Sequence, residues 1–171
     1  MKKHVALTLL VLTTLGVLRA HVDIERQDGA YFLSFQGKKH DVLGAFLNQT
    51  NAVLRQCDAV QVLDVNSPQA ATALTAIRNY SPPDSDGARL LGLLQQGPWL
   101  LAELEFSALN PAVVLLRADG GALQLPERAI WSGTTHPWKA GPLIRNYISR
   151  QAPDAPAALF SCFTPLSNSL K

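Results

Sequence analysis

Residues 99–125 read WLLAELEFSALNPAVVLLRADGGALQL, and they hold the clearest strand pattern in this chain of 171 residues. Apolar and polar residues alternate in part from Trp99 to Phe106, as they do in a strand with one buried face. Val113–Arg117 and Ala122–Leu125 then flank Ala-Asp-Gly-Gly at residues 118–121. Asp-Gly and Gly-Gly pairs are typical of tight hairpin turns, so the sequence predicts antiparallel pairing here.

The segments next to this region predict several helices. Residues 88–95 are rich in Leu and predict a helix that ends before Gly97-Pro98. Ser67-Pro68 is a typical helix start, with a core face at Ala70, Ala71, Leu74 and Ile77. A last helix begins at Pro142 and ends before Pro153. The remaining short apolar segments are predicted to be strands, at residues 60–65, 128–131 and 157–163.

The N-terminal third predicts a hairpin followed by a long helix. Residues 22–25 and 31–36 are predicted strands, joined by a turn at Gln27-Asp28-Gly29. Asp41 is a candidate N-cap for a helix over about residues 42–56. The apolar residues of this helix recur at helical spacing and are expected to face the core, at Leu43, Phe46, Leu47, Thr50, Val53, Leu54 and Cys57.

These patterns predict an α+β fold in residues 21–171, as a single compact domain. Strands predominate at both ends of the chain, so we expect an antiparallel or mixed sheet covered by about four helices. The composition supports a folded domain, because 47% of the residues are hydrophobic and only 16% are charged. The Pro-rich loop at residues 81–87 is the one candidate boundary, and the halves on either side are small.

Residues 1–20 resemble an export signal. Lys2, Lys3 and His4 precede 14 residues without charge, from Val5 to Leu18, and Ala20 suits the position before a cleavage site. This apolar run is shorter than the ~20 residues that cross a bilayer. We therefore expect a periplasmic or secreted protein cleaved after Ala20, with retention of the segment as an anchor as the alternative.

Cleavage would also change the charge of the chain. The full chain carries 15 basic and 13 acidic residues, and removal of residues 1–20 leaves 12 basic and 13 acidic ones. A net charge near zero gives no electrostatic support for binding nucleic acid or an anionic membrane. No nucleic-acid partner is expected, nor a membrane span in the mature chain.

Cys57 and Cys162 are the two cysteines, and they lie 105 residues apart. In an oxidising compartment such a pair is expected to form a disulfide. Two buried free thiols, or one reactive thiol, are the alternatives. The spacing matches no metal motif, and we expect neither a metal site nor a cofactor.

No sequence motif points to a particular reaction. The chain has no Gly-rich nucleotide loop, no H-E-x-x-H and no G-x-S-x-G. Glu103 and Glu105 would share a strand face, and paired carboxylates can divide acid and base roles, although a solvated strand face is the simpler interpretation. Lys38-Lys39-His40 is interpreted as a solvated turn, and His21 as a terminal residue with a remote capacity to chelate copper.

The segment Trp131-Ser-Gly-Thr-Thr-His-Pro-Trp138 has the most unusual composition. Two indole rings flank small hydroxyls and an imidazole, which is the chemistry of peptide and sugar contact surfaces. Packing of both Trp rings in the core is the structural alternative. The candidate binding residues are Trp131, Thr134, Thr135, His136 and Trp138.

Two classes of function remain open. The first is a non-enzymatic exported protein that binds another protein of the cell envelope, either as an inhibitor or immunity-like partner or as an assembly factor. The second is a small periplasmic hydrolase acting on cell wall or peptide, with His136 beside Glu103 or Glu105. A cleft that joins His136 to a carboxylate would favour the enzyme, whereas an exposed apolar patch would favour the binding protein.

Overall fold

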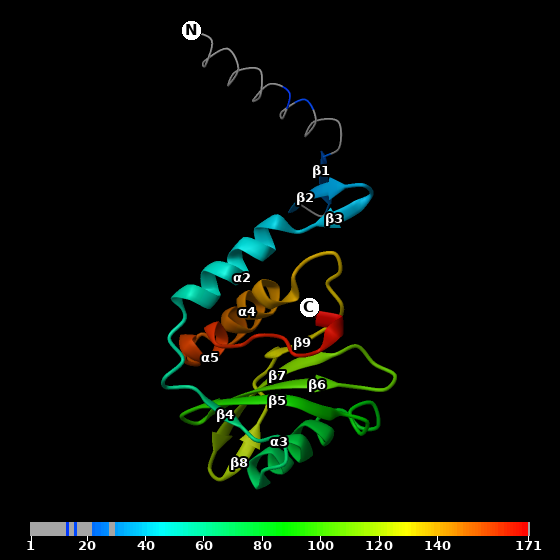
Figure 1. The fold of residues 1–171 in the computed structure, drawn as a ribbon. Coiled ribbons are helices and arrows are strands. Elements are labelled where there is room, and N and C mark those ends of the chain that lie inside the picture. Colours follow the sequence, from blue (N-terminus) through cyan, green and yellow to red (C-terminus); the bar gives the residue numbers. More distant parts are fainter. Residues whose placement is uncertain (1–12, 14–15, 17–21, 28–29, 171) are drawn as a thin grey trace.

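A six-stranded antiparallel sheet forms the centre of the molecule, and helices cover both of its faces (Figure 1). This computed structural model describes residues 13, 16, 22–27 and 30–170. Residues 1–20, in which the export signal is predicted, lie outside the described residues except for Thr13 and Gly16. The elements in chain order are β1 (Val22–Gln27), β2 (Ala30–Phe35), β3 (Lys38–His40), α2 (Val42–Leu54), β4 (Gln61–Leu63), α3 (Pro68–Arg78), β5 (Arg89–Gln96), β6 (Trp99–Glu105), β7 (Ala112–Asp119), β8 (Ala122–Gln124), β9 (Ile130–Ser132), α4 (Ala140–Gln151), α5 (Ala157–Ser161) and a 3-10 turn (Asn168–Leu170).

The central sheet has the order β4-β5-β6-β7-β8, and β9 also pairs with β7. β8 and β9 lie one after the other along the same edge of β7, since β8 pairs with residues 117–119 and β9 with residues 112–114. The predicted hairpin turn is confirmed, with Gly120 and Gly121 at φ +56° and +87°. Only glycine adopts such angles without strain. The prediction of an α+β domain with antiparallel pairing is therefore confirmed for the described residues.

β6 is buried on both faces, which explains its nearly continuous apolar sequence. Trp99 and Leu101 pack against α4, α5 and the C-terminal segment. Leu100, Ala102 and Leu104 point to the opposite face and pack against α3. Successive side chains of a strand alternate between faces, so one strand contributes to both cores.

The predicted start of α3 is confirmed, whereas residues 88–95 are not a helix. The Ser67 hydroxyl accepts a hydrogen bond from the Ala70 N–H at 3.2 Å, and Pro68 follows it. Residues 89–96 instead form β5, paired with β6. Leu favours a helix only weakly, and burial between two strands outweighs that preference. Gly97-Pro98 is the hairpin turn between β5 and β6, with Gly97 at φ +57°.

Residues 157–163 were expected to form a strand, and this prediction is wrong. They contain the short helix α5, which buries Leu159 and Phe160 in the core beside α4. A short apolar run fits either a buried strand or a buried helix turn, because five residues are too few to show a period. Lys38–His40, expected in a turn, form β3, and the turn lies at Gln36 and Gly37.

The predicted disulfide between Cys57 and Cys162 is present, with Cα atoms 5.8 Å apart. Cys57 does not lie on a helix, because α2 ends at Leu54 and the chain turns before β4. The bridge therefore joins the segment after α2 to the end of α5. A small second sheet, β1-β2-β3, lies at the N-terminal end of α2 (Figure 1).

Candidate functional site

The Trp131–Trp138 segment connects β9 to α4, and its two Trp residues take part in packing. Trp131 is half-buried and packs against the core under α4. The Trp138 ring meets the buried Phe32 of β2 edge to face, with ring centroids 5.2 Å apart. The Thr135 hydroxyl donates to the Trp138 carbonyl at 2.9 Å, while Thr134 and His136 are exposed. The segment thus attaches the small sheet to the rest of the domain.

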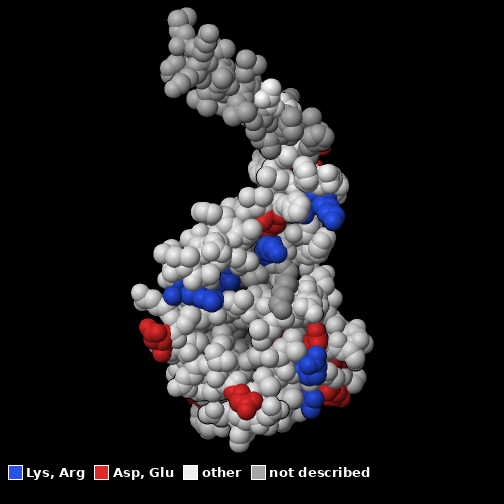
Figure 2. Space-filling view, in the orientation of Figure 1, with Lys and Arg blue, Asp and Glu red and all other residues white. Residues whose placement is uncertain are grey.

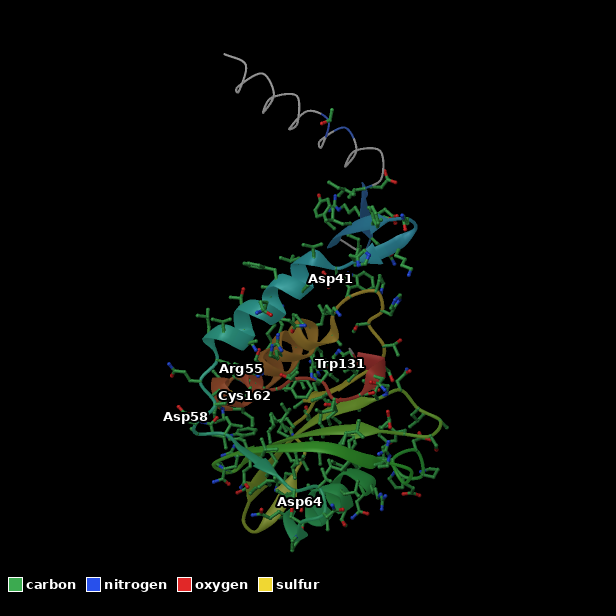
Figure 3. The ribbon with its side chains drawn as sticks, in the orientation of Figure 1. Asp41, Arg55, Asp58, Asp64, Trp131 and Cys162 are labelled. Atoms are coloured by element: carbon green, nitrogen blue, oxygen red, sulfur yellow. A yellow bond between two sulfur atoms is a disulfide. The ribbon has the colours of Figure 1, made fainter. Side chains whose placement is uncertain are left out.

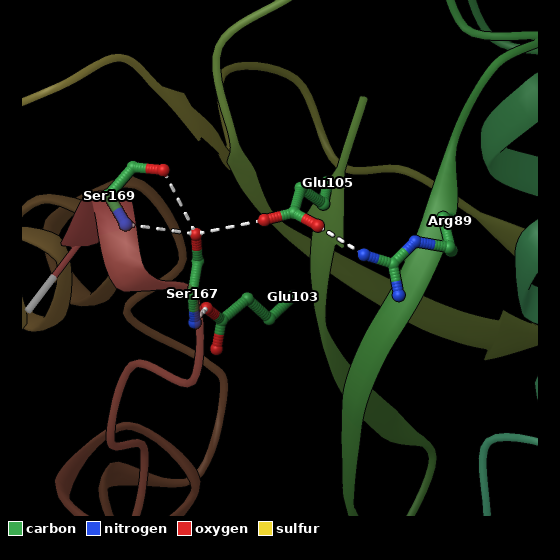
Figure 4. A network of polar contacts seen from close by, with 5 residues as sticks. All are labelled: Arg89, Glu103, Glu105, Ser167 and Ser169. Carbon is green, nitrogen blue, oxygen red and sulfur yellow. Dashed lines mark hydrogen bonds and ion pairs between the residues drawn. The ribbon is translucent and has the colours of Figure 1, made fainter. Parts of the chain in front are cut away.

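Glu103 and Glu105 point to the same face of β6, as expected, and they hold the C-terminal segment (Figure 4). Glu103 is only 2% exposed, and its carboxylate accepts hydrogen bonds from the N–H groups of Leu166 and Ser167, at 2.9 and 2.7 Å. Glu105 pairs with Arg89 and accepts a bond from the Ser167 hydroxyl at 3.4 Å. Backbone N–H groups satisfy the buried charge of Glu103.

His136 and Glu103 line different cavities. His136 lines a cleft of about 390 Å³ together with His40, Asp41 and Trp138. Glu103 lines another, of about 270 Å³, next to Leu166. Asp41 is the one carboxylate among the described residues that line the His136 cleft, and each of its oxygens already accepts one hydrogen bond, from the N–H groups of Gly44 and Lys139.

Asp41 therefore joins the N-termini of two helices. Its Oδ1 accepts the Gly44 N–H at 2.7 Å and caps α2, as the sequence predicts. Its Oδ2 accepts the N–H of Lys139, the residue before α4, at 2.9 Å. Gly44 makes this possible, since a Cβ there would lie 2.1 Å from Oδ2.

The polar side of α2 faces the body of the protein. The Asn51 amide donates to the Ser161 carbonyl at 2.7 Å, and Asn48 Oδ1 accepts from Arg145 of α4 at 2.8 Å. Arg55, the residue after α2, donates to the Thr164 hydroxyl at 2.7 Å. Asp41 and Arg55 mark the two ends of the helix in Figure 3. These polar contacts, and not an apolar seam, attach α2 to α4 and α5.

The apolar side of α2 faces outward, contrary to the sequence-based expectation that it would face the core. Gly44 is the only buried residue of the helix. Figure 2 shows the surface over α2 as an almost uncharged area. The exposed fractions of its large side chains are Leu43 61%, Phe46 64%, Leu47 45%, Val53 72% and Leu54 72%.

The small sheet carries a second group of exposed apolar side chains. Ile24 of β1 lies opposite Leu33 of β2, and Val22 lies opposite Phe35, so these residues share one face. Ile24 is 71% exposed, and Leu33, Phe35 and Tyr31 are also exposed. We define the apolar docking face as this sheet face together with the outer side of α2 (Val42, Leu43, Phe46, Leu47, Val53 and Leu54).

No protein-family model, curated protein or solved structure matches this chain. Within the described part of the chain, no helix has both the length and the apolar character needed to cross a membrane. Those same residues contain no cluster of three His, Cys, Asp or Glu side chains that could hold a metal ion. The candidate site therefore rests on its geometry, and its main feature is the apolar docking face.

Proposed function

We propose that this chain is an exported, non-enzymatic protein that binds another protein of the cell envelope through the apolar docking face. The observation that carries this proposal is the reversed orientation of α2, which buries amides and exposes Leu, Phe and Val. An amphipathic helix on a globular domain normally turns its apolar side inward. The reversed arrangement leaves apolar surface in water, and a partner would remove it.

The size of the face supports a protein as its occupant. Large contiguous apolar patches on monomers usually mark interaction sites. Ten large apolar side chains of α2 and the small sheet are exposed, with exposed fractions of 37–72%. One partner contributes ~800 Å² to a standard interface, an area that only a group of many such side chains can supply. Phe46 lies in the middle of α2, and aromatic residues are enriched among the side chains that dominate binding energy.

The disulfide supports export, because such bridges persist in oxidising compartments. Support for a non-enzymatic role comes from the separation of His136 and Glu103 into different cavities. A hydrolase would need a base and a carboxylate within hydrogen-bond reach of each other or of one substrate. We therefore retain protein binding as the proposed function.

A photo-crosslinking residue at position 46, in the full chain expressed in its host, tests the proposal. We expect one predominant adduct with a different protein. The matched control carries the same residue at position 109, since Leu109 is also exposed but lies in the loop between β6 and β7. Leu43→Glu with Val53→Glu should abolish the adduct and leave the melting temperature within ~4 °C, as exposed substitutions do.

Three results would contradict the proposal. The first is an adduct formed equally well from positions 46 and 109. The second is an adduct between two copies of this chain, which would make the face a dimer interface. The third is an adduct with lipid alone, which would make it a membrane-binding surface.

A further inference from the structure

A cleft of about 450 Å³ lies on the inner side of α2, opposite the apolar docking face. Three cationic side chains line it, those of Arg55, Lys139 and Arg145. No Asp or Glu is among the described residues of its wall. In Figure 2, blue basic side chains lie below the uncharged surface of α2, on the side toward α4. Arg55 and Arg145 therefore place two guanidinium groups at a concave surface, where they would attract an anion.

Arg55 and Arg145 are held in this wall by neutral groups only. Arg145 donates to the Phe163 carbonyl at 3.1 Å and to Asn48 Oδ1 at 2.8 Å. Arg55 donates to the Thr164 hydroxyl at 2.7 Å. Each guanidinium has five N–H donors, so both keep donors for a ligand. Neither forms an ion pair with a described residue.

The two guanidinium groups also repel one another. Burial lowers the pKa of Arg145, and the charge of Arg55 lowers that pKa further. Two like charges without an intervening anion destabilise each other. An anion bound between the two guanidinium groups would offset this repulsion. Because Arg145 is already partly desolvated in the folded protein, binding would not have to remove that part of its hydration.

The start of α4 adds to the positive potential. Lys139 and Gly141, at the first residues of the helix, line the cleft. The N-terminus of a 12-residue helix carries a partial positive charge. Gly141 also lets α2 approach, because a Cβ there would lie 2.9 Å from Asn48 Oδ1.

We propose that this cleft binds the carboxylate of a peptide-like ligand between Arg55 and Arg145. The planar guanidinium matches a carboxylate with two parallel hydrogen bonds. Gln49 and Asn51 line the same cleft, and side-chain amides can hydrogen-bond to peptide groups. The Asn51 amide already donates one hydrogen bond, to the Ser161 carbonyl. The volume is within the ~300–1,000 Å³ of small-ligand pockets. The site is independent of the apolar docking face, which lies on the other side of α2.

A purely structural role is the alternative, since Arg145 also joins α4 to α2. That role accounts for Arg145 and for the hydrogen bond from Arg55 to Thr164, but not for the placement of two like charges close enough to lower the pKa of Arg145. The test must therefore measure ligand binding and folding separately, and it must include Arg55.

The experiment is an NMR titration of the folded chain with N-acetyl-dialanine as the free acid. The C-terminal amide of the same dipeptide and inorganic phosphate are titrated in parallel. We expect saturable shifts of residues around the cleft with the acid and none with the amide. Arg55→Gln and Arg145→Gln should each weaken binding at least about tenfold, because each removes a charge-assisted hydrogen bond. Arg150→Gln is the matched control, since Arg150 is exposed at the other end of α4.

Four results would overturn the proposal. The first is the absence of saturable binding of the acid to the unaltered chain, and the second is equal binding of acid and amide. The third is equal weakening by Arg150→Gln and Arg55→Gln. The fourth is tighter binding of phosphate than of the acid, which would assign the cleft to phosphate. Arg55→Gln decides the matter if Arg145→Gln fails to fold, because Arg55 has one side-chain contact to lose.

Discussion

At the scale of single residues, Asp41 both caps α2 and connects it to α4. It is the N-cap of α2, and at the same time it accepts the N–H of Lys139 at the start of α4. A residue that satisfies only one helix terminus contributes about 0.5–2 kcal/mol. Asp41 accepts hydrogen bonds at the N-termini of two helices, so it contributes to their relative position as well as to the stability of the fold.

Asp41→Ala should therefore lower the free energy of unfolding by about 1–3 kcal/mol, as the loss of a cap plus a second charge-assisted bond implies. Asp41→Asn keeps one good acceptor, so its free energy of unfolding should lie between those of the parent chain and Asp41→Ala. Urea denaturation at neutral pH measures the loss. Asp154→Ala, at an exposed acid after α4, is the control and should change stability by less than ~0.5 kcal/mol. An equal loss of stability in Asp41→Ala and Asp154→Ala would refute the role of Asp41 at the two helix N-termini.

At the scale of elements, the small sheet is held partly by one ion pair. Lys39 Nζ of β3 lies 2.8 Å from Glu25 Oε2 of β1, across the middle strand. The hydrogen bond from Lys39 lowers the pKa of Glu25 below the ordinary value of 4.5, and one from Ser34 lowers it further. A lowered pKa stabilises the folded sheet above pH 4.5, and this stabilisation is lost as the pH falls through the folded value.

The carboxyl resonance of Glu25 should thus titrate with a midpoint below 4.5. In Lys39→Gln the midpoint should move up toward 4.5, because the largest cause of the shift is removed. The protection factors of the β1 and β2 amides, which are corrected for the pH dependence of intrinsic exchange, should fall in acid in the parent chain and less so in the variant. A midpoint that is the same in both proteins would show that the pair does not form in solution.

The elements also show what the sequence predicts and what it leaves open. Turn chemistry predicted the β7–β8 hairpin, and capping residues predicted the starts of α2 and α3, because these signals act between neighbours in the chain. β5 was missed because its pairing with β6 is a tertiary interaction. The Gly97-Pro98 pair, interpreted from the sequence as the end of a helix, could instead have indicated a hairpin, because Gly suits the first position of a two-residue turn.

The prediction that the apolar side of α2 faces the core is wrong, and the reason is informative. Helical periodicity located its apolar side correctly, but a period does not say what lies against that side. One signal was available: α2 has no charged residue, and a solvated helix face normally carries charges. Its polar side consists of Asn, Gln and Thr, which suit contact with backbone carbonyls and Arg on α4 and α5. The Arg55–Arg145 cleft was not predictable, because its residues lie 90 positions apart in the chain.

At the scale of the whole molecule, α2 is held at both ends, and between them by the polar contacts of Asn48 and Asn51. Asp41 holds the N-terminal end to α4, and the disulfide at Cys57 and Cys162 holds the C-terminal end to α5. Apolar packing between α2 and the core is small, since only Gly44 of the helix is buried. The bridge thereby compensates for the missing hydrophobic seam and keeps the apolar side outward.

Cys57→Ser with Cys162→Ser should therefore lower stability by about 2–5 kcal/mol, the range for native disulfides that close long loops. For a chain of this length the melting temperature would fall by about 4–20 °C. Calorimetry of the double variant, and of the parent chain under strong reductant, measures the fall. Hydrogen exchange should show the earliest opening in α2 while β5–β7 stay protected. Unchanged melting under reductant, or equal opening of α2 and the central sheet, would mean that apolar packing holds α2 after all and that its outer side is not free for a partner.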